Sequence, residues 1–361
     1  MNELIYKGSL NSLSFGNVSY NLLREMYKSG MKVSIFPMGE RVDLDAFDLI
    51  DKDFQSWILS MINERFNSIS KDIPTLSQWH INGSESRISS HQTLFTFHEL
   101  DQPTEVEKSI VKLQDNCIFS SSYSRDIFNN SGCDNVSCVN IGFDEDFLDL
   151  NLENDNEPIH FGIMGKFEKR KNTGQIIHQW IKKFGNNYDY QLTCCIDNPF
   201  FSNEQMNGIK HQILGGKKIG NVNFLPRLKT NSEVNHFLNS IDIDLSGLSG
   251  AEGWNLPAFN ATALGKWSIV MDHTSHKDWA NSKNCILIQP TQTTEAYDEV
   301  FFKKGSTFNQ GSINLISDNV MSEAFDKSIK KARKINKSGL LLKDKFTYKK
   351  TLKNILDIIK K

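Results

Sequence analysis

The chain has 361 residues and a formal net charge of −2, with 39% hydrophobic and 23% charged residues. This composition excludes a disordered or collagen-like chain, and a chain of this length usually divides into two units of about 150 residues. The near-neutral charge excludes a global attraction to nucleic acid or to an anionic membrane, so any such binding would need a local basic patch.

The N-terminal half begins with the pattern of an α/β protein. A strand at residues 4–6 is followed by a loop at 10–17 that holds Gly16, a helix that stops at Gly30, and a strand at 32–36 that is closed by Pro37. Further strands are expected at 93–97 and 116–119, whereas residues 47–90 predict helices without clear bounds. Polar residues follow both later strands, at the edge where open α/β sheets bind ligands.

An acidic, asparagine-rich stretch at residues 144–158 has the composition of a linker. We therefore predict a first domain at 1–150 and a second domain at 151–343. The second domain restarts the α/β pattern with a strand at 160–164, a basic loop at 165–173 and a helix that ends near Phe184. A terminal helix is expected at 344–361, because apolar residues there repeat at helical spacing.

The most informative stretch of the second half is a strand at 241–246, a glycine-rich turn, a helix at 256–264 that Gly265 ends, and a strand at 267–271. A helix N-terminus presents free N–H groups and a positive dipole end, so this turn predicts an anion site. Pro257 suits the first helical turn. Glu252 precedes the helix, where its carboxylate either binds a polyhydroxyl ligand or caps the helix.

The basic loop at 165–172 follows the first strand of the second half and contains Lys166, Lys169, Arg170 and Lys171. At the carboxyl end of that strand its lysines would face the same cleft as the anion site. Because a diphosphate needs two or more cations, the two elements together predict a diphosphate site.

Glu252-Gly-Trp-Asn-Leu-Pro257, with the small-residue helix that follows it, resembles the donor motif of retaining GT-B glycosyltransferases similar to glycosyltransferase family 4 (group 1). Gly165-Lys166 with Lys171-Asn172 resembles the element that holds the donor diphosphate in that family, with lysine in place of arginine. Weaker similarities to the family's N-terminal domain occur at residues 14–18, 97–101, 120–128, 131–132 and 141–144.

The resemblance implies two Rossmann-like domains that face each other across a cleft, with a C-terminal helix that returns to the first domain. It implies an enzyme that transfers a sugar, with retention of configuration, from a nucleotide sugar such as a UDP- or GDP-sugar. The acceptor hydroxyl would belong to a glycan, a lipid-linked sugar or a modified DNA base. No metal and no further cofactor are expected.

By the same resemblance, the residues expected to be catalytic are Glu252, His98 and Lys171. His98 would contact the donor sugar, although a histidine held by neighbouring backbone is an equal alternative. The residues expected to bind the donor nucleotide and phosphates are Gly16, Asn17, Lys166, Lys171, Gly253, Trp254, Asn255, Leu256 and Asn260.

Asn260 departs from the family pattern, because it stands where a second glutamate usually follows eight residues after the first. An amide can donate and accept hydrogen bonds but carries no charge. This change supports an alternative in which the chain is a non-catalytic binding or scaffold subunit. The lysine-rich segment at 327–361 similarly keeps transfer to a modified DNA base as a third hypothesis.

Other polar residues are assigned more ordinary roles. His273 and His276 lack further ligands nearby in sequence and predict hydrogen-bonding loop residues. Asp101 is expected to cap a helix near Thr104, and Glu99 either binds an acceptor hydroxyl or caps that helix. The six cysteines lack the paired short spacings of a zinc site, and no segment has the length of a membrane span. We therefore expect a cytoplasmic protein with reduced thiols, with peripheral membrane contact as an alternative.

Overall fold

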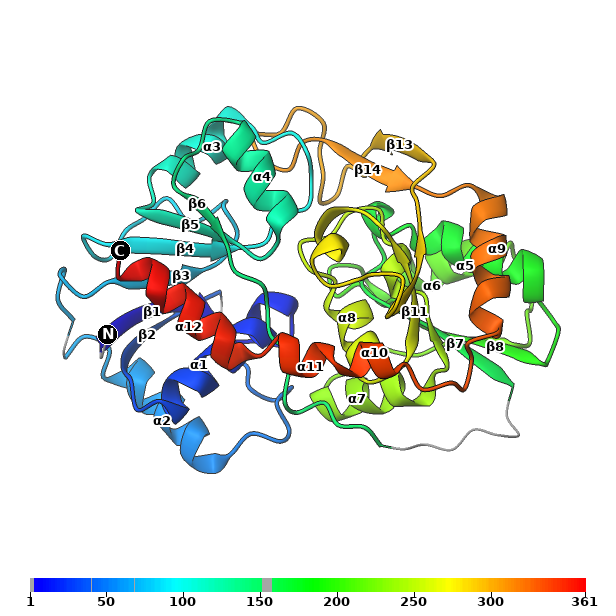
Figure 1. The fold of residues 1–361 in the computed structure, drawn as a ribbon, viewed down its shortest axis with the longest axis horizontal. Helices are drawn as coiled ribbons and strands as arrows, with labels where there is room; N and C mark the ends of the chain where they lie inside the picture. The colour runs from blue at the N-terminus through cyan, green and yellow to red at the C-terminus, as the bar shows by residue number, and fades with distance from the viewer. Residues whose placement is uncertain (1–2, 40, 68, 151–157) are drawn as a thin grey trace.

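The computed structural model describes residues 3–39, 41–67, 69–150 and 158–361. It contains two parallel six-stranded sheets, each flanked by helices, as Figure 1 shows. The α/β prediction is therefore confirmed. The predicted domain boundary after residue 150 falls at residues 151–157, which lie outside the described residues.

The first sheet has the order β2-β1-β3-β4-β5-β6. Its strands are β1 Glu3–Ser9, β2 Lys32–Met38, β3 Thr75–Gln78, β4 Gln92–Thr96, β5 Asn116–Phe119 and β6 Val136–Cys138. The helices of this half are α1 Ser14–Lys28, α2 Lys52–Asn63, α3 Glu105–Lys112 and α4 Ser122–Asn130.

The second sheet has the order β12-β11-β10-β7-β8-β9. Its strands are β7 Ile159–Met164, β8 Tyr190–Cys195, β9 Val222–Phe224, β10 Ile243–Asp244, β11 Trp267–Met271 and β12 Cys285–Ile288. Helices α5 Thr173–Phe184, α6 Asn203–Ile213, α7 Asn231–Ser240, α8 Leu256–Ala263 and α9 Asp318–Ile329 accompany it, and β13 Gln292–Glu295 pairs antiparallel with β14 Ser312–Leu315.

Three predicted element bounds were wrong. The loop predicted at 10–17 ends earlier, because α1 begins at Ser14 and includes Gly16. Strand β2 continues through Pro37, which is tolerated because β2 is an edge strand whose free side needs no N–H. The strand predicted at 241–246 is reduced to Ile243–Asp244, because a 3₁₀ turn begins at Ser246.

The chain end returns from the second half to the first through α10 Lys337–Leu340, α11 Leu342–Lys345 and α12 Tyr348–Ile359. Helix α12 packs against α1 and buries Leu352 and Ile355, as the apolar spacing predicted. The Phe143 N–H donates to the Phe346 carbonyl at 2.9 Å, which ties the end of the first half to this segment. The predicted return of the C-terminal helix is confirmed.

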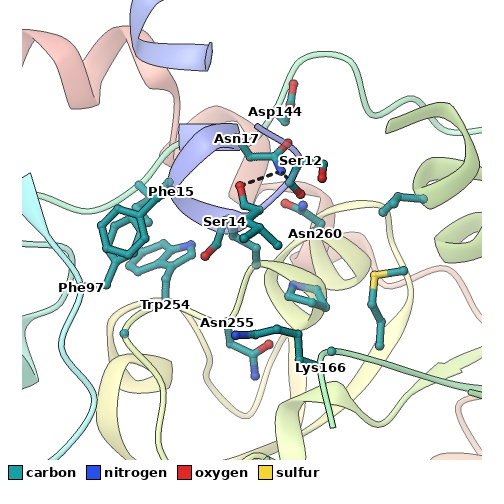
Figure 2. A pocket seen from close by; sticks show the side chains of 18 of the residues that line it. Ser12, Ser14, Phe15, Asn17, Phe97, Asp144, Lys166, Trp254, Asn255 and Asn260 are labelled. Atoms are coloured by element: carbon teal, nitrogen blue, oxygen red, sulfur yellow. Dashed lines mark hydrogen bonds between the residues drawn. The ribbon is translucent and has the colours of Figure 1, made fainter. Parts of the chain in front are cut away.

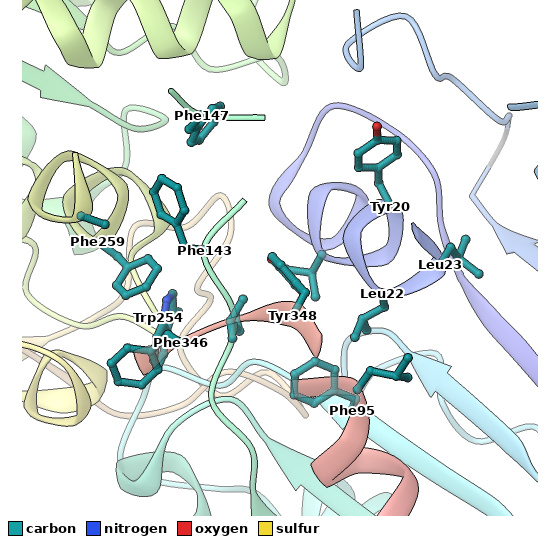
Figure 3. Close-up of a cluster of buried hydrophobic side chains, with 14 of the residues drawn as sticks. Tyr20, Leu22, Leu23, Phe95, Phe143, Phe147, Trp254, Phe259, Phe346 and Tyr348 are labelled. Atoms are coloured by element: carbon teal, nitrogen blue, oxygen red, sulfur yellow. The ribbon is translucent and has the colours of Figure 1, made fainter. Parts of the chain in front are cut away.

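Aromatic side chains from both halves and from the returning segment share one buried cluster, which Figure 3 shows. Phe143 comes from the end of the first half, Trp254 and Phe259 come from the second, and Phe346 comes from the segment before α12. Because one core joins these parts, the glycine-rich turn that contains Trp254 is held against both sheets. No helix in the described ranges is both long and apolar enough to cross a membrane.

Candidate functional site

A cavity of about 430 Å³ lies between the two sheets. Its walls include Asn17, Phe97 and Asp144 of the first half and Lys166 and Asn260 of the second, and Figure 2 shows these side chains around it. Several of these residues follow the carboxyl ends of parallel strands, where α/β sheets bind ligands. The cavity is therefore the candidate ligand site.

Two glycines of the turn after β10 allow close packing that any side chain would prevent. A Cβ atom at Gly250 would lie 2.5 Å from the Asn314 carbonyl oxygen, and one at Gly253 would lie 2.9 Å from the Phe97 Cβ of the first half. The Ser120 hydroxyl also donates to the Gly253 carbonyl at 2.7 Å. The turn is therefore fixed between the two halves of the molecule.

Asn255 holds the start of α8 in place. Its backbone adopts a left-handed conformation with φ of 70°, and its side-chain oxygen accepts from the Ala258 N–H at 3.4 Å. Its amide nitrogen donates to the Ser246 carbonyl at 2.9 Å. Because Pro257 lacks an N–H, Leu256 is the residue of this first turn whose N–H meets no acceptor in the described ranges. At the predicted anion site, the first turn of α8 thus offers one free N–H group rather than several.

His276 is fully buried beneath this turn. Its Nδ1 lies 2.8 Å from the Met271 carbonyl, and its Nε2 lies 3.0 Å from the Asn255 amide. Burial lowers the pKa of the imidazole to about 4. A neutral ring that donates from Nδ1 and accepts at Nε2 satisfies both contacts. The prediction that His276 is a hydrogen-bonding residue is confirmed.

Replacement of His276 by Gln tests this burial through the pH dependence of stability. Because the folded pKa of about 4 lies below the ordinary 6.5, the unfolded chain takes up the proton first as pH falls. We expect His276 to make the wild type lose stability from pH 6.5 to 4. Urea unfolding should therefore show the stability gap between the wild type and His276→Gln shrinking over that range. A constant gap, or an equal change for the exposed His178→Gln control, would contradict this account.

Glu252 is buried between two cations. Its Oε1 lies 2.6 Å from Lys171 Nζ, and its Oε2 lies 3.0 Å from an Arg170 guanidinium nitrogen. Burial raises the pKa of the Glu252 carboxyl, but attraction to Arg170 and Lys171 outweighs burial and holds that pKa well below its usual range. Glu252 is thus a fixed carboxylate on the cavity wall, and the alternative that it caps α8 is wrong because Asn255 does so.

Arg170 extends this contact into a chain of charges. Its guanidinium also lies 3.0 Å from Glu168, and Lys166 Nζ lies 2.8 Å from the other oxygen of that carboxylate. Three cations against two carboxylates leave this chain of charges with a net charge of +1. Arg170 was missed as a site residue, since in sequence it is one of several basic residues in a turn and only its burial distinguishes it.

Trp254 lies on the cavity wall but is only 3% exposed. Its ring contacts Phe259 and Phe346 edge-on, with centroids 5.3 and 5.6 Å away. Figures 2 and 3 show the same side chain at the cavity and in the buried aromatic cluster. Packing is therefore its main structural role.

Of the other residues expected to bind the donor nucleotide, some line the cavity and one does not. Asn260, Asn17 and Lys166 line the cavity, and the buried Oδ1 of Asn260 has no hydrogen-bond partner in the described ranges. Gly16 does not line it. A Cβ atom at Gly16 would lie 2.0 Å from the Asn11 carbonyl oxygen, so glycine is required there by the close approach of that loop to α1.

His98 also lies outside this first cavity and lines a second one beside it.

The helix near Thr104 is capped by Thr104 itself, whose hydroxyl accepts from the Glu107 N–H at 3.1 Å. The cap expected of Asp101 was therefore wrong, and its carboxylate accepts from the Ser312 N–H at 2.7 Å instead.

All six cysteines are free, and no three His, Cys, Asp or Glu side chains gather as a metal site in the described ranges.

No protein-family model matches the chain, and a search of curated proteins finds no match. Solved structures share the fold across the whole chain. Sucrose-phosphate synthase from Thermosynechococcus elongatus has a TM-score of 0.67 and 13% identity and covers 100% of this chain and 98% of its own. HepE from Anabaena, solved with UDP, has a TM-score of 0.63 and 11% identity over 100% of both chains. A trehalose 6-phosphate synthase from Burkholderia multivorans has a TM-score of 0.64 and 9% identity, covering 100% of this chain and 98% of its own. The chain therefore has the two-domain GT-B fold of these proteins.

Proposed function

We propose that this protein transfers a sugar from a nucleoside diphosphate sugar to a hydroxyl group of an acceptor. The observation that carries the proposal is the convergence of Lys166, Lys171, Glu252 and the start of α8 on one interdomain cavity. A cationic wall beside a fixed carboxylate suits a ligand with an anionic part and a polyhydroxyl part. The GT-B fold and the UDP-bound structures of HepE support the same class of donor.

In this proposal the donor diphosphate lies against Lys166, Lys171 and the Leu256 N–H. These groups would stabilise the negative charge that develops on the leaving group without a metal ion. Glu252 would accept hydrogen bonds from hydroxyl groups of the donor sugar, because its two cation partners keep it ionised. The unpartnered Oδ1 of Asn260 would accept a hydrogen bond from the ribose.

The transfer itself exchanges one bond at the anomeric carbon of the donor sugar. The acceptor oxygen bonds to that carbon while the bond to the phosphate oxygen breaks, and the electron pair stays on the nucleoside diphosphate. The proton of the acceptor hydroxyl passes to the released diphosphate. Attack on the same face as the leaving group, which would retain the configuration, rests on the resemblance of residues 250–257 to the retaining family.

The replacement Lys166→Ala tests the phosphate site, because Glu168 keeps Arg170 as a partner when Lys166 is removed. Loss of one charge-assisted contact should raise the Kd for the preferred nucleoside diphosphate about tenfold, as measured by calorimetry. The adjacent exposed Lys169→Ala is the matched control and should bind normally. The donor class is identified by thermal shift and by hydrolysis of UDP-, GDP-, ADP- and CMP-sugars. A panel without any binding or turnover would refute the transferase and leave the non-catalytic alternative.

A modified DNA base is a second candidate acceptor, and one observation that motivates it is the distribution of charge along the chain. Residues 327–361 contain thirteen Lys or Arg and only two Asp or Glu, although the whole chain has a net charge of −2. Such a segment could contact DNA phosphates in a salt-dependent way. An oligonucleotide with a hydroxymethylated base should therefore be tested as an acceptor alongside sugars.

A further inference from the structure

A second cavity of about 440 Å³ adjoins the proposed donor cavity. The two share Trp79, His80, Phe97 and Glu99 as a common wall. These residues directly follow β3 and β4, which are neighbours in the first sheet. The second cavity therefore opens next to the place where a donor sugar bound at Glu252 would react.

The outer wall of this cavity comes from the segment between β13 and β14, residues 296–311, which we call the strap. The strap leaves the second half and bonds to the first, as its course near α3 in Figure 1 illustrates. The Thr104 hydroxyl donates to the Thr307 carbonyl at 2.6 Å, and the Asn309 N–H donates to Glu107 at 2.9 Å. Phe308 and Asn309 thus close the cavity from the outside.

Two polar side chains on the cavity wall have unused hydrogen-bonding capacity. His98 is 3% exposed, and its Nε2 has no partner in the described ranges. Glu99 is half-buried, and within the same ranges it makes neither a hydrogen bond nor a salt bridge. A buried polar atom without a partner costs free energy, so the His98 Nε2 indicates a ligand with a complementary hydroxyl group, to which the free Glu99 carboxylate offers an acceptor.

An aromatic wall lies beside these polar groups. Trp79 and Phe97 both contact Phe15, with ring centroids 5.9 and 4.3 Å away. The Trp79 indole lies close to Gly83, where an added Cβ atom would be 3.0 Å from Nε1, so a side chain at position 83 would crowd the ring. A flat indole beside hydrogen-bonding groups suits the apolar face of a sugar ring, whose rim carries hydroxyl groups.

The charges of the two cavities differ in sign. Lys166, Arg170 and Lys171 line the donor cavity, whereas the described residues that line the second cavity include Glu99 and Glu107 but no lysine or arginine. A phosphate group there would face these two carboxylates without a cationic side chain among the described lining residues, which is unfavourable in a partly desolvated site. A neutral hydroxyl can instead donate to a carboxylate.

From these features we infer that the second cavity binds the acceptor and that the acceptor is a sugar without a phosphate group. The inference rests on the proposed transferase function and specifies its acceptor. It separates this protein from the structurally similar sucrose-phosphate and trehalose 6-phosphate synthases, whose names specify phosphorylated products. In the transfer step, Glu99 would accept a hydrogen bond from an acceptor hydroxyl, and Trp79 would support the sugar ring.

The test compares each neutral hexose or disaccharide with its 6-phosphate, using the donor that the protein hydrolyses and mass spectrometry of products. We expect kcat/KM to be at least tenfold higher for the neutral sugar. Glu99→Lys should shift this ratio at least tenfold toward the phosphate, whereas Glu323→Lys, on the exposed face of α9, should leave it unchanged. Trp79→Ala should raise the acceptor KM about tenfold. Glu99→Gln keeps the shape of the side chain but removes its charge, so it shows whether loss of the negative charge alone shifts the acceptor preference.

Transfer confined to sugar phosphates, or to the hydroxymethylated oligonucleotide, would overturn the inference. So would an unchanged acceptor preference in a folded Glu99→Lys variant. Binding of the same sugars to the protein alone, followed by saturation-transfer NMR, tests the cavity without a donor. Neutral-sugar binding that Trp79→Ala abolishes would support the inference even if no nucleotide sugar is hydrolysed, so the two proposals fail separately.

Discussion

Glu252→Ala is expected to abolish donor hydrolysis and to lower the free energy of unfolding by about 3 to 5 kcal/mol. The stability loss follows because Arg170 and Lys171 are both largely buried and would lose a partner at 3.0 and 2.6 Å. The activity loss follows because the proposed sugar-binding carboxylate disappears. Urea unfolding and mass-spectrometric detection of hydrolysis at a temperature where the variant is folded would measure both effects.

Two further variants separate these effects. Glu252→Gln keeps the shape of the side chain but removes its charge, so we expect lost activity with a smaller loss of stability than in Glu252→Ala. Glu323→Ala removes an exposed carboxylate from α9 and should change neither quantity. If Glu252→Ala were as stable and as active as the wild type, neither the buried ion pairs nor the sugar-binding role could stand.

Trp254→Ala is expected to lower the free energy of unfolding by about 3 to 5 kcal/mol, because it removes a large side chain from a closed cluster. The indole is 3% exposed and packs against Phe259 and Phe346. Chemical denaturation gives the stability, and calorimetry with the preferred nucleotide gives the affinity. Trp57→Ala on α2, where the ring is only half-buried, is the matched control and should cost less.

The conservative variant Trp254→Phe distinguishes packing from ligand binding at this position. If the indole acts mainly in the core, Trp254→Phe should recover most of the lost stability and keep nucleotide affinity within a few-fold of the wild type. A stable Trp254→Phe protein that no longer binds nucleotide would show that the indole chiefly contacts the nucleotide of the donor, as the sequence resemblance implied.

Much of the fold was predictable because the signals are local. Strands β5 and β11 match the predicted bounds, since each is a short apolar run between turn residues. Strand β3 was missed, although it lies between β1 and β4 in the sheet. Its four residues Thr-Leu-Ser-Gln carry too little apolar pattern, and its burial comes from neighbouring strands. Trp79 and His80 follow β3, so this wall of the second cavity was missed with it.

The sequence by itself determined the α/β class, the turn and helix at 250–263 and the basic loop beside it, because these depend on residues close together in the chain. Only the tertiary structure decided how they combine. Lys171 and Glu252 are 81 residues apart, and Ser120 and Gly253 are 133 residues apart. Burial and contacts at such separations arise when the sheets and the returning helix pack together. Packing therefore decided that Arg170 holds Glu252, that Trp254 belongs to the core and that His98 faces a separate cavity.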